Sequence, residues 1–245
     1  MHFNKDTMRE LLKIALPMVV SQGAFAVMIF TDRYFMSQID PTHMAAALGG
    51  GVACFFSFCF FSGLLSYGNA MAAQYLGAGE PEKCPKVVTQ GFIMAMMSIP
   101  ALVVITYFVS GIFENMGHDS RQVELERTYY TILMLGIVVT LAKICLSSYF
   151  AGIARTHVVM ICDVFGLVIN VPLSYVMVFG KLGLPALGIV GAGISTIVAT
   201  ILGFIAFVSF YLAREHREKF CVMESFHLDW GILRRFLRLG FPSGM

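Results

Sequence analysis

Six long apolar stretches, separated by short polar connections, dominate the chain. They cover residues 13–37, 44–73, 87–109, 124–153, 157–180 and 188–213. Each reaches or exceeds the roughly 20 helical residues that cross the hydrocarbon core of a bilayer. A more polar segment follows at 214–235. The pattern therefore predicts an all-α polytopic membrane protein with six transmembrane helices.

The end of the chain resembles its beginning. Residues 11–17 read LLKIALP and residues 236–242 read FLRLGFP, each a basic, amphipathic entry into an apolar helix with a proline near its start. A six-helix unit followed by the start of a similar unit is typical of duplicated transporters with twelve helices in two lobes. We therefore expect a six-helix N-terminal lobe at 1–213, a cytoplasmic inter-lobe linker at 214–235, and a truncated start of helix 7 at 236–245. A chance similarity between two proline-led segments is the alternative.

Positive charge predicts the orientation of the helices. Cytoplasmic segments of membrane proteins carry an excess of Lys and Arg. With the N-terminus in the cytoplasm, four basic residues lie at the outer side (Arg33, Arg121, Arg127 and Lys181). Twelve lie at the cytoplasmic side: Lys5, Arg9, Lys13, Lys83, Lys86, Arg155, Arg214, Arg217, Lys219, Arg234, Arg235 and Arg238. The asymmetry predicts a cytoplasmic N-terminus.

Composition agrees with a membrane location and excludes other classes. The chain is 58% hydrophobic and 13% charged, whereas about a quarter of the residues in soluble domains are charged. A net charge of +2 without a basic stripe gives no nucleic-acid signal. The six cysteines form no CxxC pair and the histidines are scattered, so we predict neither a disulfide framework nor a metal site.

Motifs of enzymes are missing from the sequence. It contains no nucleophile elbow, HExxH, P-loop or glycine-rich dinucleotide turn. We therefore expect no enzyme activity and no cofactor. Without a nucleotide-binding motif in this chain, energy for transport would come from an ion gradient.

Asp32 is the first candidate for function, because an ionisable group in the hydrocarbon costs about 2.5–3.5 kcal/mol on insertion scales. It lies about 19 residues into the first span, roughly 28 Å from the cytoplasmic end. There it could exchange a proton, or hold a cation such as Na⁺ when charged. Pairing with Arg33 or Lys143 is the structural alternative.

Other polar residues within the spans could line the same cavity. Asp163, Gly166, Asn170 and Ser174 share one face of the fifth span, where Asn170 is the deeper member and Asp163 could be only interfacial. Lys143 lies mid-span, either as a counter-ion to Asp32 or with its amine extended to the interface. Asn69 follows Ser62 and Ser66 on the second span, where bonding between helices is the alternative to a cavity role.

Several stretches resemble the multidrug and toxin extrusion (MATE) family, most closely its NorM-type branch. The similarity covers nearly the whole chain. It is carried by the run from Pro17 to FTDRYFMS, MAAQYLGAGEPEK at 71–83, FAGIARTHVVM at 150–160, INVPLSYVMVFGKLGLPALGIVGAGIST at 169–196 and LRLGFPSGM at 237–245.

This resemblance implies a twelve-helix, two-lobe antiporter that exports small cationic, amphipathic drugs in exchange for Na⁺ or H⁺. Asp32 matches the functional acidic position of helix 1, and Asn170 matches the helix 5 asparagine of archaeal members. Those members carry an aspartate where this chain has Ser174, a departure from their N-lobe proton site. The resemblance also implies a C-terminal lobe beyond this chain and a bacterial inner (plasma) membrane.

Two other readings remain open at this point. A lipid-linked oligosaccharide flippase of the same superfamily would line its cavity with cations, and the buried Lys143 is its only hint. A truncated, non-transporting six-helix protein is the third reading.

Overall fold

The computed structural model describes residues 5–244, and the regular elements of that range are all helices. Residues 1–4 and 245 of the predicted units lie outside the described residues. Short 3₁₀ helices cover 81–83, 113–115 and 222–225. The α-helices are α1 (Lys5–Ser37), α2 (Pro41–Ser66), α3 (Gly68–Gly77), α4 (Cys84–Met97), α5 (Ile99–Ile112), α6 (Ser120–Leu135), α7 (Ile137–Gly152), α8 (Thr156–Phe179), α9 (Gly188–Leu212), α10 (Arg214–Phe220) and α11 (Trp230–Gly244).

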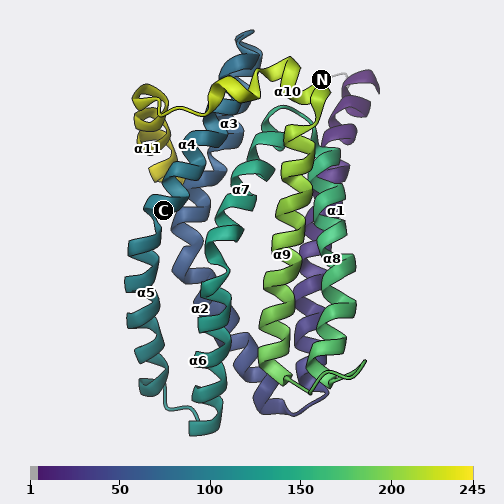
Figure 1. Cartoon of the computed structure of the whole chain (residues 1–245), viewed down its shortest axis with the longest axis vertical. Helices are drawn as coiled ribbons and strands as arrows, with labels where there is room; N and C mark the ends of the chain where they lie inside the picture. Colours follow the sequence, from purple (N-terminus) through teal and green to yellow (C-terminus); the bar gives the residue numbers. More distant parts are fainter. Residues whose placement is uncertain (1–4, 245) are drawn as a thin grey trace.

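The six predicted spans are present in the structure. Four helical stretches are long and apolar enough to cross a membrane: Leu11–Ser37, Pro41–Gly77, Thr156–Phe179 and Gly188–Leu212. The third and fourth spans are each a pair of helices, α4 with α5 and α6 with α7, bent by 41° and 49°. Figure 1 shows the members of each pair following one another along the long axis, so each pair crosses the bundle once.

The two bends have different local causes. Pro100 lies in the first turn of α5, where its missing amide donor costs no hydrogen bond, and the break falls at Ser98 just before it. The second break falls at Gly136, without a proline. A Cβ at Gly136 would lie 2.8 Å from Cγ1 of Ile197 on α9, so the glycine allows the bent segment to approach α9 closely.

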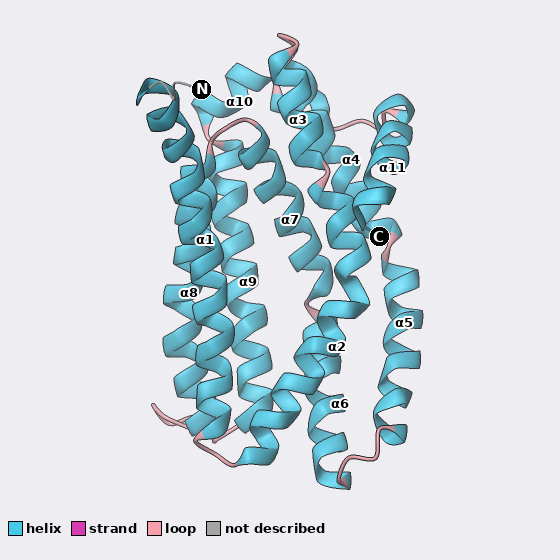
Figure 2. Cartoon of the chain, turned by 180° about the vertical axis from the view of Figure 1, so that it is seen from behind, coloured by secondary structure: helices cyan, strands magenta, loops and turns pink. Residues whose placement is uncertain are grey.

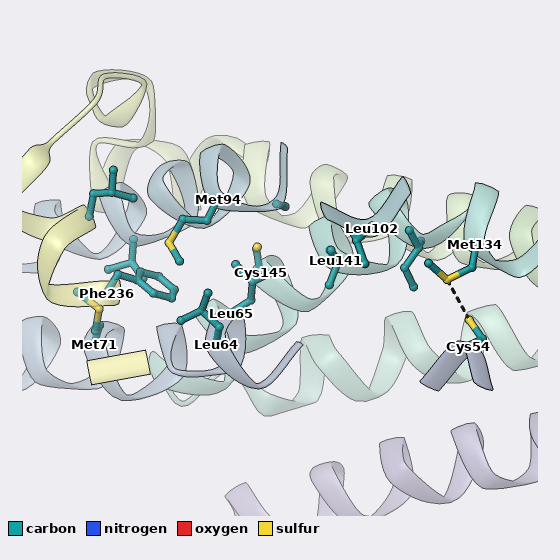
Figure 3. Packing of buried hydrophobic residues seen from close by; sticks show 14 of the residues in the cluster. Cys54, Leu64, Leu65, Met71, Met94, Leu102, Met134, Leu141, Cys145 and Phe236 are labelled. Atoms are coloured by element: carbon teal, nitrogen blue, oxygen red, sulfur yellow. Dashed lines mark hydrogen bonds between the residues drawn. The ribbon is translucent and has the colours of Figure 1, made fainter. Parts of the chain in front are cut away.

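Buried apolar side chains hold the broken spans together. One cluster runs from Cys54 and Met134, past Leu141, to Cys145 and Phe236, and joins α2, α4, α5, α6, α7 and α11 (Figure 3). On the other side of the molecule, α1, α8 and α9 pack side by side (Figure 2). The lobe therefore places the three helices with the conspicuous polar residues next to one another.

The C-terminal segment packs on this lobe. α11 begins at Trp230, so the boundary predicted at 235/236 falls inside a helix. Phe236 is buried in the main cluster, and a Cβ at Gly240 would lie 3.0 Å from the carbonyl oxygen of Leu64 on α2. Upstream, the buried Gln90 of α4 donates to the carbonyl of His227 at 2.9 Å. The predicted linker is therefore partly helical and is held to the first lobe.

Candidate cation site between α1, α8 and α9

Helical periodicity brings the polar residues of α1 and α8 to the interface between these helices. On α1 the buried positions include Ser21, Ala24 and Asp32, and on α8 they include Asn170 and Ser174. Spacings of three, four, seven or eight residues keep side chains on one helical face. The site candidates on these two helices therefore face each other instead of lipid.

Asp32 is the centre of a hydrogen-bonded group. Its side chain is only 6% exposed. Ser174 of α8 donates to Oδ1 at 2.9 Å, and Thr196 of α9 lies within 3.1 Å of Oδ2. The Thr196 hydroxyl is also 2.9 Å from the carbonyl of Ala192, so one proton is shared between two acceptors. Three helices thus meet at one carboxylate.

Asn170 completes this group and brings an unused acceptor. Its side chain is fully buried, and Nδ2 lies 3.4 Å from Oγ1 of Thr196. Its Oδ1 accepts a hydrogen bond from no residue that the structure describes. Buried polar atoms are nearly always satisfied, so an unpaired amide oxygen beside a carboxylate points to a donor or a cation that the described residues do not supply.

Asp32 carries no ion pair within residues 5–244. Neither Arg33 nor Lys143 contacts it, so the pairings considered for Asp32 are not formed. Lys143 instead forms an ion pair with Asp163 of α8, with Nζ 2.8 Å from Oδ1. Lys143 is therefore not a counter-ion to Asp32, and it does not extend to the interface alone. Asp163 is likewise more than an interfacial residue.

The other predicted members lie apart from Asp32. Asp163 is eleven residues before Ser174 on α8, about 16 Å along the helix, and it also accepts a hydrogen bond from Ser21. Asn69 lies in the first turn of α3, a helix at the opposite end of the bundle from the C-terminal end of α1, which carries Asp32 (Figure 1). Its carbonyl oxygen faces Gly152 of α7. The structure thus joins Asn170 and Ser174 to Asp32, and separates Asp163, Lys143 and Asn69 from it.

Thr196 is the member that the sequence analysis missed. It belongs to a row of small and polar residues on α9, in which Ala192, Thr196, Thr200 and Gly203 follow at helical spacing. That spacing was a readable signal, because hydroxyl groups within a span often bond to neighbouring helices.

Apolar side chains cover the group one helical turn closer to the C-terminal end of α1. Met36 follows Asp32 on α1, Val178 follows Ser174 on α8, and Ala192 precedes Thr196 on α9; all three are at most 2% exposed and belong to one buried cluster. Tyr129 of α6 joins the same cluster. Packed side chains thus close the carboxylate off from the end of the lobe at which α1 terminates.

The donor set suits a small monovalent cation or a proton. It consists of carboxylate, amide and hydroxyl oxygens, which are hard ligands of the type that alkali and alkaline-earth ions prefer. Among the described residues, no three His, Cys, Asp or Glu side chains come together as a transition-metal site would require. One carboxylate can also hold a single proton and donate it to a hydroxyl.

Comparison with known proteins identifies the family. The MatE family model matches residues 17–176, about two thirds of the chain. The chain belongs to the MatE family. It is 27% identical to the probable multidrug resistance protein NorM of Bacillus subtilis over 98% of its own length, and 30% identical to the multidrug resistance protein MdtK of Edwardsiella ictaluri over 97%. It spans only 54% and 52% of these two relatives, about half of each.

Solved structures show the same MatE fold. An outward-facing multidrug resistance MATE family transporter matches 96% of this chain with a TM-score of 0.84 at 20% identity. A MOP superfamily transporter from Pyrococcus furiosus matches with a TM-score of 0.83, also at 20% identity. The chain covers 51% of each. The six-helix unit is therefore one lobe of this fold, and the predicted all-α, multi-pass architecture is confirmed.

Proposed function

We propose that this chain is the N-terminal lobe of a cation-coupled multidrug efflux antiporter of the NorM type. The names of the relatives support export of drug-like compounds. The proposal that a cation drives export rests on Asp32, a buried carboxylate with no ion pair among the described residues. Ser174 and Thr196 hold it beside the unpaired oxygen of Asn170. An isolated carboxylate in a membrane span needs a positive partner, and a coupling ion supplies it.

Coupling follows from competition for one negative charge. When Na⁺ or H⁺ is bound to Asp32, the negative charge of the carboxylate is neutralised, so a cationic drug gains little electrostatic binding energy from it. When the ion leaves, the carboxylate attracts the drug. Each ligand thus lowers the affinity for the other, and this reciprocal effect is sufficient for exchange if the two sides of the membrane are exposed in turn.

A second lobe is part of this proposal. The chain spans about half the length of its relatives, so we infer that a further six-helix lobe forms the other wall of the transport pathway. We further propose a cytoplasmic N-terminus in the bacterial inner membrane, on the charge asymmetry described above. The protein then acts as a transporter and not as an enzyme.

The Lys143–Asp163 pair favours drug export over the flippase reading. A cavity for pyrophosphate-linked lipids needs excess positive charge, and the charge of Lys143 is neutralised by Asp163 at 2.8 Å. No other basic side chain lies mid-span in the sequence.

The test is efflux of a cationic dye from cells that lack their own drug pumps, using the protein with everything its reading frame encodes. Asp32→Asn should abolish ion-driven efflux while the amount in the membrane stays at the level of the parent. Glu114→Gln is the control, because Glu114 is an exposed carboxylate that pairs with Arg127 at the surface. Normal efflux by Asp32→Asn would refute the proposed coupling.

A further inference from the structure

A second carboxylate lies at the same α1–α8 interface and, like Asp32, accepts a hydrogen bond from a serine of the facing helix. Ser21 of α1 donates to Asp163 of α8, and Ser174 of α8 donates to Asp32 of α1. Both pairs join residues 142 positions apart, so the helices present two reciprocal Ser–Asp pairs about 16 Å from each other. The Ser21–Asp163 pair, called the inner pair, lies three helical turns nearer the proposed cytoplasmic end than the Ser174–Asp32 pair.

Asp32 and Asp163 differ in whether a positively charged side chain is bound to the carboxylate. Asp32 has no cation within residues 5–244, whereas Asp163 holds the ammonium of Lys143 at 2.8 Å on Oδ1 and the hydroxyl of Ser21 on Oδ2. Lys143 comes from α7, so the cation at the inner carboxylate is supplied by a third helix. An alkylammonium group tethered to the protein thus stands where a free organic cation would bind.

This ion pair points into the lobe. Exposed apolar residues of α8 form a stripe of Ile161, Phe165, Val168 and Tyr175, and Asp163 lies on the opposite side of that helix. Lys143 and Asp163 nevertheless keep 25% and 18% of their side-chain surface exposed. Both groups therefore keep part of their surface uncovered, while Asp163 lies away from the exposed apolar stripe of α8.

The lysine packs against a glycine. Gly203 of α9 lies beside it, and a Cβ there would contact Nζ at 3.8 Å, so the glycine leaves the space of one methyl group next to the amine. The lysine stem has four flexible carbons, and among the described residues its amine forms an ion pair with Asp163 alone. Exchanging one ammonium for another keeps Asp163 paired, and the flexible stem of Lys143 has to carry the released ammonium to a polar environment.

We propose that Asp163 is a second cation-binding carboxylate, occupied at rest by Lys143, which the ammonium or other cationic group of an amphipathic substrate displaces. The proposal rests on the proposed function, since it assigns cationic compounds as the ligands. It differs from the Asp32 site in position and in resting occupant.

The test measures binding, not efflux, of tetraphenylphosphonium to the protein in nanodiscs of zwitterionic lipid. All variants carry Asp32→Asn, so the outer carboxylate makes no contribution. Adding Lys143→Gln should raise the affinity for the probe at least about tenfold, because the carboxylate is freed. Adding Asp163→Asn to that variant should return the affinity to the starting value. No rise with Lys143→Gln, or a rise that persists without Asp163, would overturn the proposal.

A charge-conserving variant covers the case in which Lys143→Gln does not fold. Lys143→Arg keeps the ion pair, and a guanidinium can hold a carboxylate through two hydrogen bonds. The probe should then bind more weakly than to the Asp32→Asn parent, and equal or tighter binding would contradict displacement. Failure of the proposed function would appear separately, as unchanged efflux by Asp32→Asn in cells.

Discussion

Ser174 of α8 donates a 2.9 Å hydrogen bond to Oδ1 of Asp32 on α1, and both side chains are buried. The hydroxyl fixes the carboxylate in one orientation, with its other oxygen beside Thr196 and the unpaired oxygen of Asn170. Position 174 is also where the family resemblance leads us to expect an aspartate. A hydroxyl that orients one carboxylate thus stands where the resemblance implies a second carboxylate.

Replacing Ser174 with alanine should weaken coupling without abolishing it. Hydrogen bonds to charged groups contribute about 1.5–3 kcal/mol, and this one holds the carboxylate oxygen in place for a bound Na⁺. The Na⁺ concentration that gives half-maximal efflux should therefore rise by about tenfold or more. Dye efflux at graded Na⁺ and fixed pH measures it. Ser195→Ala is the matched control, because Ser195 is equally buried but donates to the carbonyl of Ala192 in its own helix. Equal responses of the two variants would contradict a role for Ser174.

A substitution of Asn170 tests whether Na⁺ or H⁺ is the coupling ion. If the amide oxygen is a ligand of Na⁺, Asn170→Ala should reduce the affinity for Na⁺ about tenfold, the effect of losing roughly 1.4 kcal/mol, at fixed pH. Radioactive Na⁺ binding to the purified protein measures it. Asn115→Ala serves as a control, because Asn115 is exposed and donates to Gly111 in its own segment. Unchanged Na⁺ binding would exclude the amide as a ligand and leave protonation of Asp32 as the coupling event.

The parts of the site that the sequence predicted are those that one helix determines by itself. Asp32, Asn170 and Ser174 were found because apolar runs define spans and helical spacing defines faces. Thr196 and the partner of Lys143 depend on how α7, α8 and α9 pack, which no single helix encodes. Lys143 and Asp163 are twenty residues apart on two spans, and only the turn between those spans brings them together.

Neighbouring glycines of α2 differ in how closely α6 packs against them. A Cβ at Gly50 would lie 2.9 Å from the carbonyl oxygen of Glu126 on α6, a backbone atom with no freedom to move aside. A Cβ at Gly51 would meet only a ring atom of Tyr129 at 3.8 Å, an ordinary contact. The same substitution at adjacent positions should therefore give different results.

Gly50→Ala should destabilise the lobe by about 1–3 kcal/mol, the usual cost of adding a methyl group to a packed interface. Gly51→Ala should be close to neutral. Thermal unfolding of the two purified variants, followed by loss of the monodisperse fraction in detergent, measures the difference. A lower midpoint for Gly51→Ala than for Gly50→Ala would show that α2 and α6 are not packed as described.

His216 makes the attachment of α10 to the lobe dependent on pH. The ring is 1% exposed, with Nε2 3.0 Å from the hydroxyl of Tyr149 and Nδ1 3.3 Å from Arg155. Burial first, and then the positive charges of Arg155 and Lys219, lower the pKa of His216 from 6.5 to about 4. The imidazole is therefore neutral when α10 is docked and gains a proton below pH 6.5 when α10 detaches.

The sign of the effect follows from these two pKa values. Docking of α10 is fully stable above pH 6.5 and weakens as the pH falls toward 4, since the detached state binds more protons. At pH 5 the loss should be about 2 kcal/mol, or roughly thirtyfold in hydrogen-exchange protection of the α10 amides after correction for intrinsic rates. His216→Phe should remove this dependence because a phenyl ring does not titrate, while His157→Gln, at an exposed histidine of α8, should retain it. Protection that falls equally in His216→Phe would assign the effect to another group.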